Sequence, residues 1–153
     1  MIEVKLSVAL KAHAAFSRIG ATELPPKGSY RVARIISKLA TEKAAFEQTQ
    51  RRLFLDNGAV ENGMAVQFRP PVIADGESEE AFAARKAEYE GNIKKLSHDL
   101  DQVLSETVKI DFDPIPIGLL EAVEFDRADP NRSVVKSTIK PNDMADVLDF
   151  IGE

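Results

Sequence analysis

Residues 30–57 read YRVARIISKLATEKAAFEQTQRRLFLDN, and this stretch contains neither proline nor glycine. Val32, Leu39, Phe46 and Leu53 recur at every seventh position, and charged or polar side chains fill most of the remaining surface. This period predicts one long amphipathic helix with a single apolar face. At a rise of about 1.5 Å per residue the helix would be roughly 40 Å long, so we expect another helix to lie along it.

A second helix with the same period is predicted from Ser78 to about Ser105, with Ser78 as its N-terminal cap. Two helices of similar length joined by a compact excursion predict an antiparallel hairpin over about residues 26–105. The two apolar stripes resemble a coiled-coil seam and form the predicted interaction face. That face consists of Val32, Leu39, Phe46, Leu53, Phe82, Tyr89, Leu96 and Val103.

The predicted hairpin leads to three further expectations about contacts between its two helices. Leu39 should pack near Leu96, and the acidic start of the second helix should lie near Arg51 and Arg52 in the first. Gly91 interrupts the second helix at a cost of about 1 kcal/mol relative to alanine. We therefore expect a close helix contact at Gly91.

The remaining segments are shorter. Ser7 is placed to cap a helix that runs to about Arg18, and Pro141 begins a terminal helix that reaches Ile151. Apolar alternation or short apolar runs near residues 66, 110, 124 and 139 predict strands that form one small sheet. Residues 126–137 read as a polar loop. The predicted fold is a mostly helical α+β domain over residues 1–153, with a β or irregular C-terminal cap at about 106–153.

Composition sets limits on the class of protein. The chain has 153 residues, a hydrophobic share of 44%, a charged share of 29% and no cysteine. These values are typical of a globular protein and exclude disulfides and thiolate metal sites. A net charge of -5 argues against nonspecific nucleic-acid binding. The sequence predicts neither a signal peptide nor a membrane-spanning segment.

A basic stripe lies at the start of the long helix. Lys27, Arg31, Arg34 and Lys38 are spaced three or four residues apart, with Tyr30 beside them. Such a stripe is able to hold a phosphate group, which makes these five residues the candidate ligand-binding site. The alternative is a solvated helix face that pairs with acids of a neighbouring element.

Two other sets of residues carry possible chemistry. Asp111 and Asp113 alternate on a predicted strand and would lie on the same side, as a cation site or an acid–base pair requires. Charge at a sheet edge also prevents pairing with other chains, which is the alternative interpretation. His13 and His98 have no partner at ligand spacing. We predict no catalytic residue, metal site or cofactor.

Parts of the chain resemble small proteins of tailed bacteriophages. The resemblance rests on residues 24–38 (LPPKGSYRVARIISK), Ala45-Phe46-Glu47, residues 108–117 (VKIDFDPIPI) and the start of the last helix at Pro141-Asn142-Asp143. It covers most of the chain except residues 59–76 and 126–137. The resemblance implies a phage or prophage setting but brings no functional residue with it.

These observations lead to three functional hypotheses. The preferred one is a non-enzymatic phage protein that acts by protein–protein contact, as a virion assembly accessory, a minor structural component or a host-factor binder. Its partner would be a phage or host protein, or a second copy, in the host bacterial cytoplasm or the virion. The second is a binder of a nucleotide signal that counters host defence. The third is a metal-dependent enzyme that uses Asp111 and Asp113.

Overall fold

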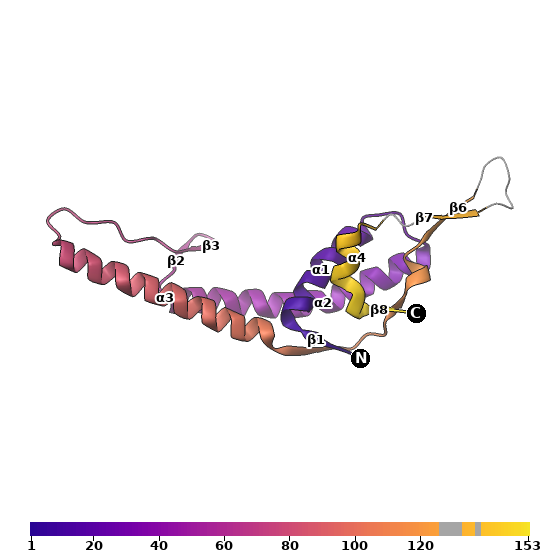
Figure 1. Cartoon of the computed structure of the whole chain (residues 1–153), viewed down its shortest axis with the longest axis horizontal. Helices are drawn as coiled ribbons and strands as arrows, with labels where there is room; N and C mark the ends of the chain where they lie inside the picture. Colours follow the sequence, from indigo (N-terminus) through magenta and orange to yellow (C-terminus); the bar gives the residue numbers. More distant parts are fainter. Residues whose placement is uncertain (126–132, 137–138) are drawn as a thin grey trace. The chain divides into compact units, whose positions relative to one another are not determined.

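The computed structural model describes residues 1–125, 133–136 and 139–153. Long helices and short two-stranded sheets make the protein a mostly helical α+β fold, which confirms the predicted class (Figure 1). The chain divides into two compact units: unit 1 is residues 1–44 with 106–153, and unit 2 is residues 45–105. The single domain over residues 1–153 stays a prediction.

Three helices occupy most of the first 105 residues: α1 (Leu6–Gly20), α2 (Pro26–Asp56) and α3 (Glu79–Ser105). Both long predicted helices are therefore confirmed to within a few residues. The predicted cap of α1 by Ser7 is wrong, because α1 begins at Leu6 and its N-cap residue makes no side-chain hydrogen bond. The predicted cap of α3 is confirmed, since the backbone N–H of Ala81 donates to Oγ of Ser78 at 3.2 Å.

The start of α2 depends on a glycine. Pro26 is the first helical residue, a position where its missing N–H costs nothing, and the carbonyl oxygen of Pro25 accepts a bond from the N–H of Ser29 at 2.9 Å. A Cβ atom on the buried Gly28 would lie 1.7 Å from the carbonyl oxygen of Leu119. The absence of a side chain at Gly28 therefore lets α2 contact the backbone of the short helix η1 (Ile117–Leu119).

The end of α2 follows the predicted glycine chemistry. Gly58 has φ +93°, in the left-handed region. The N–H of Ala59 donates to the carbonyl of Phe54 at 3.0 Å, and the N–H of Gly58 donates to that of Leu55 at 3.3 Å. These two bonds form a Schellman motif, which satisfies the last carbonyls of the helix.

The strands form four separate pairs, so the predicted single sheet is wrong. The pairs are β1 (Ile2–Lys5) with β4 (Thr107–Ile110), β2 (Val60–Asn62) with β3 (Ala65–Gln67), β5 (Ile115–Pro116) with β8 (Ile151–Gly152), and β6 (Ala122–Phe125) with β7 (Ser133–Lys136). The strand near residue 110 pairs with the N-terminus because Ile2 and Val4 match the inward-facing Ile110 and Val108. Ile139 lies in no strand.

The C-terminal segment also departs from its prediction. The helix α4 (Pro141–Val147) is followed by the turn η2 (Leu148–Phe150) and then by β8, so the predicted helix to Ile151 is too long. Residues 133–136 of the predicted loop form β7. The rest of that loop lies outside the described residues.

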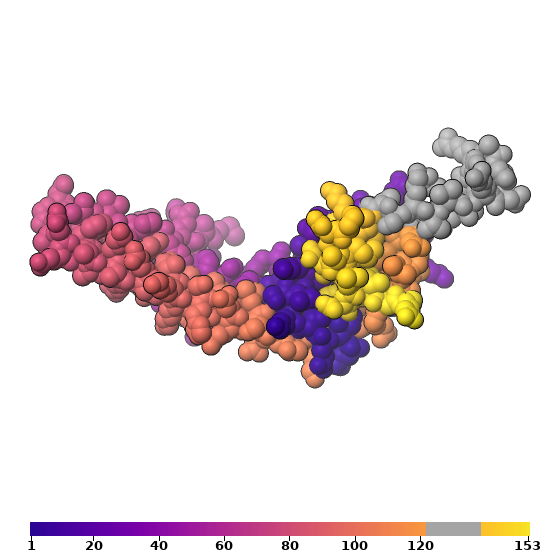
Figure 2. Space-filling model, in the orientation of Figure 1, coloured from indigo at the N-terminus to yellow at the C-terminus, as the bar shows by residue number. Residues whose placement is uncertain are grey.

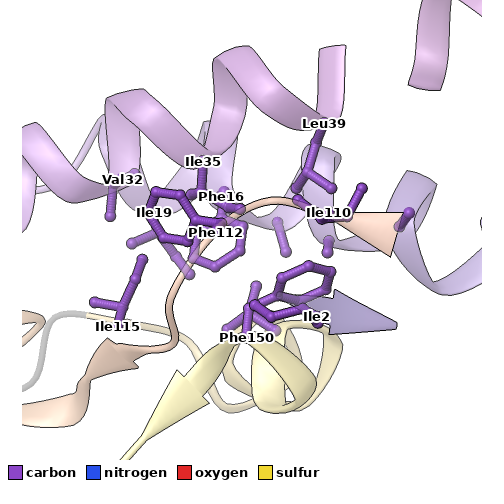
Figure 3. Close-up of a cluster of buried hydrophobic side chains, with 14 of the residues drawn as sticks. Ile2, Phe16, Ile19, Val32, Ile35, Leu39, Ile110, Phe112, Ile115 and Phe150 are labelled. Carbon is purple, nitrogen blue, oxygen red and sulfur yellow. The ribbon is translucent and has the colours of Figure 1, made fainter. Parts of the chain in front are cut away.

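The core of unit 1 brings together both ends of the chain. Phe16 and Ile19 of α1, Val32, Ile35 and Leu39 of α2, and Ile110, Phe112, Ile115 and Phe150 converge in Figure 3. The rings of Phe16 and Phe150 meet edge to face, with their centroids 5.9 Å apart. At its border, Nε of Arg18 donates to the buried carboxylate of Asp143 at 2.7 Å, which ties α1 to α4 and raises the pKa of Arg18.

Unit 2 contains the helical hairpin. The last turns of α2 and the antiparallel α3 are joined by an excursion, residues 57–78, that includes β2 and β3 (Figure 1). A Cβ atom on Gly58 would lie 3.8 Å from Nδ2 of Asn92, near the middle of α3. The first turns of α3 therefore extend beyond the end of α2. The excursion runs alongside these turns, where Val72 and Glu77 bond to Arg85.

This arrangement corrects three expectations. Arg51 bonds to Oε1 of Glu61 at 2.7 Å, and Arg52 lies 3.8 Å from Asp56, so neither has its ion pair with the acidic start of α3. Leu39 lies in the core of unit 1, whereas Leu96 is buried in unit 2 and outside that core. A Cβ atom on Gly91 would meet nothing within 4 Å, so no close contact explains this glycine.

Candidate functional site

The basic stripe lies on the part of α2 that belongs to unit 1. Three of its five residues, Arg31, Arg34 and Lys38, line one recess together with Asp111, Phe112 and Asp113. Lys27 and Tyr30 are exposed and do not line it. The structure therefore brings together two candidate sets that the sequence presented separately, the basic stripe and the aspartate pair.

Arg31 connects α2 to the segment after β4 that also lines the recess. Its Nη2 donates to the carbonyl oxygens of Asp113 and Pro114 at 3.3 and 3.2 Å, and its guanidinium carbon lies 5.0 Å from the centroid of the Phe112 ring. Its Nε is buried and has no acceptor among the described residues. Arg31 thus holds the backbone of residues 113–114 against the helix.

Arg34 contacts two aromatic rings. Its guanidinium carbon lies 5.9 Å from the centroid of Phe112 and 5.9 Å from that of Tyr30. Such cation–π contacts restrict the orientation of a guanidinium while leaving its in-plane N–H donors open. Within the described residues neither Arg34 nor Lys38 forms an ion pair or hydrogen bond with another side chain.

Phe112 is the residue of this site that sequence reasoning missed. The alternation of Val108, Ile110 and Phe112 marks it as inward-facing, and it is buried in the unit 1 core. Its ring also forms the surface against which Arg31 and Arg34 lie. Asp111 and Asp113 are both exposed, but β4 ends at Ile110, so the predicted strand does not extend to them.

Among the described residues, the structure offers no set of ligands for the metal site considered at Asp111 and Asp113. Across the described part of the chain, no group of three or more histidine, cysteine, aspartate or glutamate side chains is arranged to hold a metal ion. His13 lies on α1 in unit 1, and His98 lies on α3 in unit 2. The two histidines therefore do not share a site within one unit.

The predicted interaction face divides between the units. Val32 and Leu39 are fully buried in the core of unit 1, and Leu96 is the one buried member in unit 2. The other five members are half-buried: Phe46, Leu53, Phe82, Tyr89 and Val103. Intramolecular packing thus covers Val32 and Leu39, and it leaves the unit 2 part of the face incompletely covered.

Comparisons with protein-family models, with curated proteins and with solved structures gave no match to this chain. Among the described residues, no helix has the length and apolar character that crossing a membrane requires.

Proposed function

We propose that the protein acts by contact with another protein and that unit 2 provides the contact surface. The observation that carries this proposal is the small core of that unit. Of residues 45–105, all of which are described, only Asn57, Ala59 and Leu96 are buried. A 27-residue helix with a single buried side chain gains little from its own chain, because most helix stability comes from tertiary packing.

The excursion between α2 and α3 adds exposed apolar surface. Met64 is 95% exposed and Val72 76% exposed, and Val60 and Ile73 are exposed as well. Figure 2 shows this excursion, in magenta to rose, at the surface of unit 2. Contiguous exposed apolar surface is typical of a protein-binding site, and these four large apolar side chains all lie within this one excursion.

The biological setting of this contact is part of the proposal. The sequence resemblance supports a phage or prophage protein, present in the host cytoplasm or built into the virion. A virion assembly accessory, a minor structural component and a host-factor binder all act through such a surface. The partner is a phage or host protein, and a second copy of the chain is the other occupant that the test identifies.

Light scattering after size exclusion, combined with capture of partners from infected cells, tests the proposal. We expect a complex that the triple variant M64S/V72S/I73S abolishes. The melting temperature of the variant should change little, because these side chains are exposed. A strictly monomeric protein that captures no partner would contradict the proposal.

The matched control is I117S/L148S. Both residues are large, apolar and exposed, but they lie in unit 1. We expect this variant to bind as the wild type does. If both variants lose binding equally, the contact depends on general surface hydrophobicity and unit 2 is not the specific surface.

A second candidate function, small-ligand binding, is favoured by the recess beside Arg34. The recess has a volume of about 140 Å³, below the roughly 300 Å³ at which pockets for drug-sized ligands begin. A nucleotide signal therefore exceeds the recess and would place only one group inside it. Thermal-shift screening with nucleotides tests this candidate, since a ligand that binds only the folded protein raises its melting temperature.

A further inference from the structure

The recess beside α2 holds charges of both signs that do not neutralise one another. Arg34 and Lys38 lie on the helix side, and the exposed Asp111 and Asp113 lie on the segment after β4. No ion pair joins the two sides in the part of the chain that the structure describes.

Packing contacts restrain two of the three cationic side chains. Arg34 contacts Tyr30 and Phe112 at 5.9 Å each, and Arg31 is occupied with the carbonyls of Asp113 and Pro114. Phe112 is anchored in the core, so the backbone that carries the two aspartates keeps its place. Cationic residues of α2 and anionic residues of the segment after β4 therefore line one small space.

The volume of this space sets the size of the ligand. A volume of about 140 Å³ is well below the roughly 300 Å³ of pockets for drug-sized ligands, so the ligand must be small. Five of its six lining residues carry a charged side chain: Arg31, Arg34, Lys38, Asp111 and Asp113. The ligand is accordingly small and charged, without a large apolar part.

We propose that this recess binds a small zwitterion of the amino-acid type. Its carboxylate accepts hydrogen bonds from Arg34 and Lys38, and its ammonium group donates to Asp111 and Asp113. A multivalent anion such as phosphate meets the two aspartates as well as the basic side chains, and a simple cation meets the basic side chains as well as the aspartates, so each leaves one set of charges without a partner. The zwitterion satisfies both sides of the recess.

This inference narrows the second candidate function and is independent of the protein contact proposed for unit 2. Titration of the full chain at low ionic strength, by NMR or calorimetry, tests it with glycine, acetate, methylammonium, inorganic phosphate and adenosine monophosphate. We expect glycine to bind about ten-fold or more tightly than acetate or methylammonium, because each lacks one charge-assisted set of bonds. Phosphate should bind more weakly than glycine.

Variants identify the groups responsible. R34Q and K38Q should each weaken glycine binding by about ten-fold, whereas acetate binding to D111N/D113N should equal or exceed that of the wild type. R34K keeps the charge but loses the planar donors, so its affinity should fall between the wild type and R34Q. K86Q and D75N, which alter exposed charges in unit 2, serve as matched controls with unchanged affinity.

The outcomes separate this inference from the second candidate function. Binding of adenosine monophosphate or phosphate in preference to glycine, lost in R34Q, would overturn the zwitterion and keep a ligand site. Absence of binding by any probe at millimolar concentration would overturn both. Glycine binding that survives R34Q and K38Q in a folded protein would also overturn the inference, because the ligand would then lie elsewhere.

Discussion

Gly28 meets the carbonyl group of Leu119 at a distance that no side chain permits. Replacement by alanine would place Cβ 1.7 Å from that oxygen, and because both partners are backbone or Cβ atoms no rotamer change relieves the clash. We expect G28A to destabilise unit 1 by about 3 kcal/mol, toward the upper end for overpacking. Urea unfolding followed by circular dichroism measures the loss.

G118A is the matched control, since a Cβ atom on Gly118 would meet nothing within 4 Å and Gly118 lies next to Leu119 in the chain. We expect only a small change in this variant. If G28A were as stable as G118A, the close approach of α2 to η1 would not exist in solution.

Gly91 presents the opposite case on α3. Its surroundings are open, so alanine adds helix propensity without a clash. We expect G91A to stabilise the protein by about 0.5–1 kcal/mol. The same unfolding assay measures this gain, and a loss of stability in the isolated protein would mean that another segment of the chain or a second copy contacts this position.

Glu77 anchors the strap, defined as residues 68–78, to α3. Its carboxylate accepts two bonds of 2.6 Å from Arg85 and one of 2.9 Å from the N–H of Ala74, while Arg85 also donates to the carbonyl of Val72 at 3.0 Å. The bonds from Arg85 are the largest cause that lowers the pKa of Glu77 from its ordinary value of 4.5. The bond from Ala74 lowers it further.

A lowered folded-state pKa fixes the sign of the pH dependence. The stabilisation is complete above about pH 4.5 and is lost as the pH falls through the folded-state pKa of Glu77. We expect the protection of the amides in residues 72–77, measured against the intrinsic exchange rate at each pH, to fall over that interval, as hydrogen-exchange mass spectrometry would detect. In E77Q this protection should be low at every pH, whereas E80Q should behave as the wild type. Identical profiles for E77Q and wild type would contradict the anchoring role.

At the scale of elements, each helix draws its stability from a different source. α1 buries one continuous face, with Ala9, Ala12, Phe16 and Ile19 almost completely inaccessible. α2 has this support only in its first half, which contains all four of its buried residues. α3 buries Leu96 alone. The seven-residue period is thus the same along both long helices, but the burial it produces is not.

Truncation of one large side chain in each unit tests this difference. Phe16 is fully buried and packs on Phe150, so F16A should cost about 3–5 kcal/mol. Leu96 has fewer buried neighbours, so its truncation leaves a smaller cavity. We therefore expect L96A to cost about 2–3 kcal/mol, near the low end for such truncations. Denaturant unfolding gives both values. A loss for L96A larger than that for F16A would show that the apolar core of unit 2 is larger than its few buried residues indicate.

At the scale of the whole molecule, the two units differ in their apolar packing and in their exposed surface. Unit 1 has an apolar core and a charged recess, and unit 2 has a hairpin with incompletely covered apolar surface. The ligand proposal therefore concerns residues 31–38 and 111–113, whereas the protein contact concerns residues 57–78 and α3. Variants in one unit should leave the proposed activity of the other intact, and this separation makes the two proposals independently testable.

The sequence by itself determined the helices and most of their ends, because proline, glycine, caps and apolar period act locally along the chain. Gly58 and Ser78 have the roles that their chemistry predicts. Only the tertiary structure decided which partner each segment has. β4 pairs with the N-terminal β1, Leu39 and Leu96 are buried in different units, and Asp111 and Asp113 line the recess with Arg34. Such pairings join residues far apart in the chain, and their selection depends on how all apolar surfaces are covered together, which no local pattern contains.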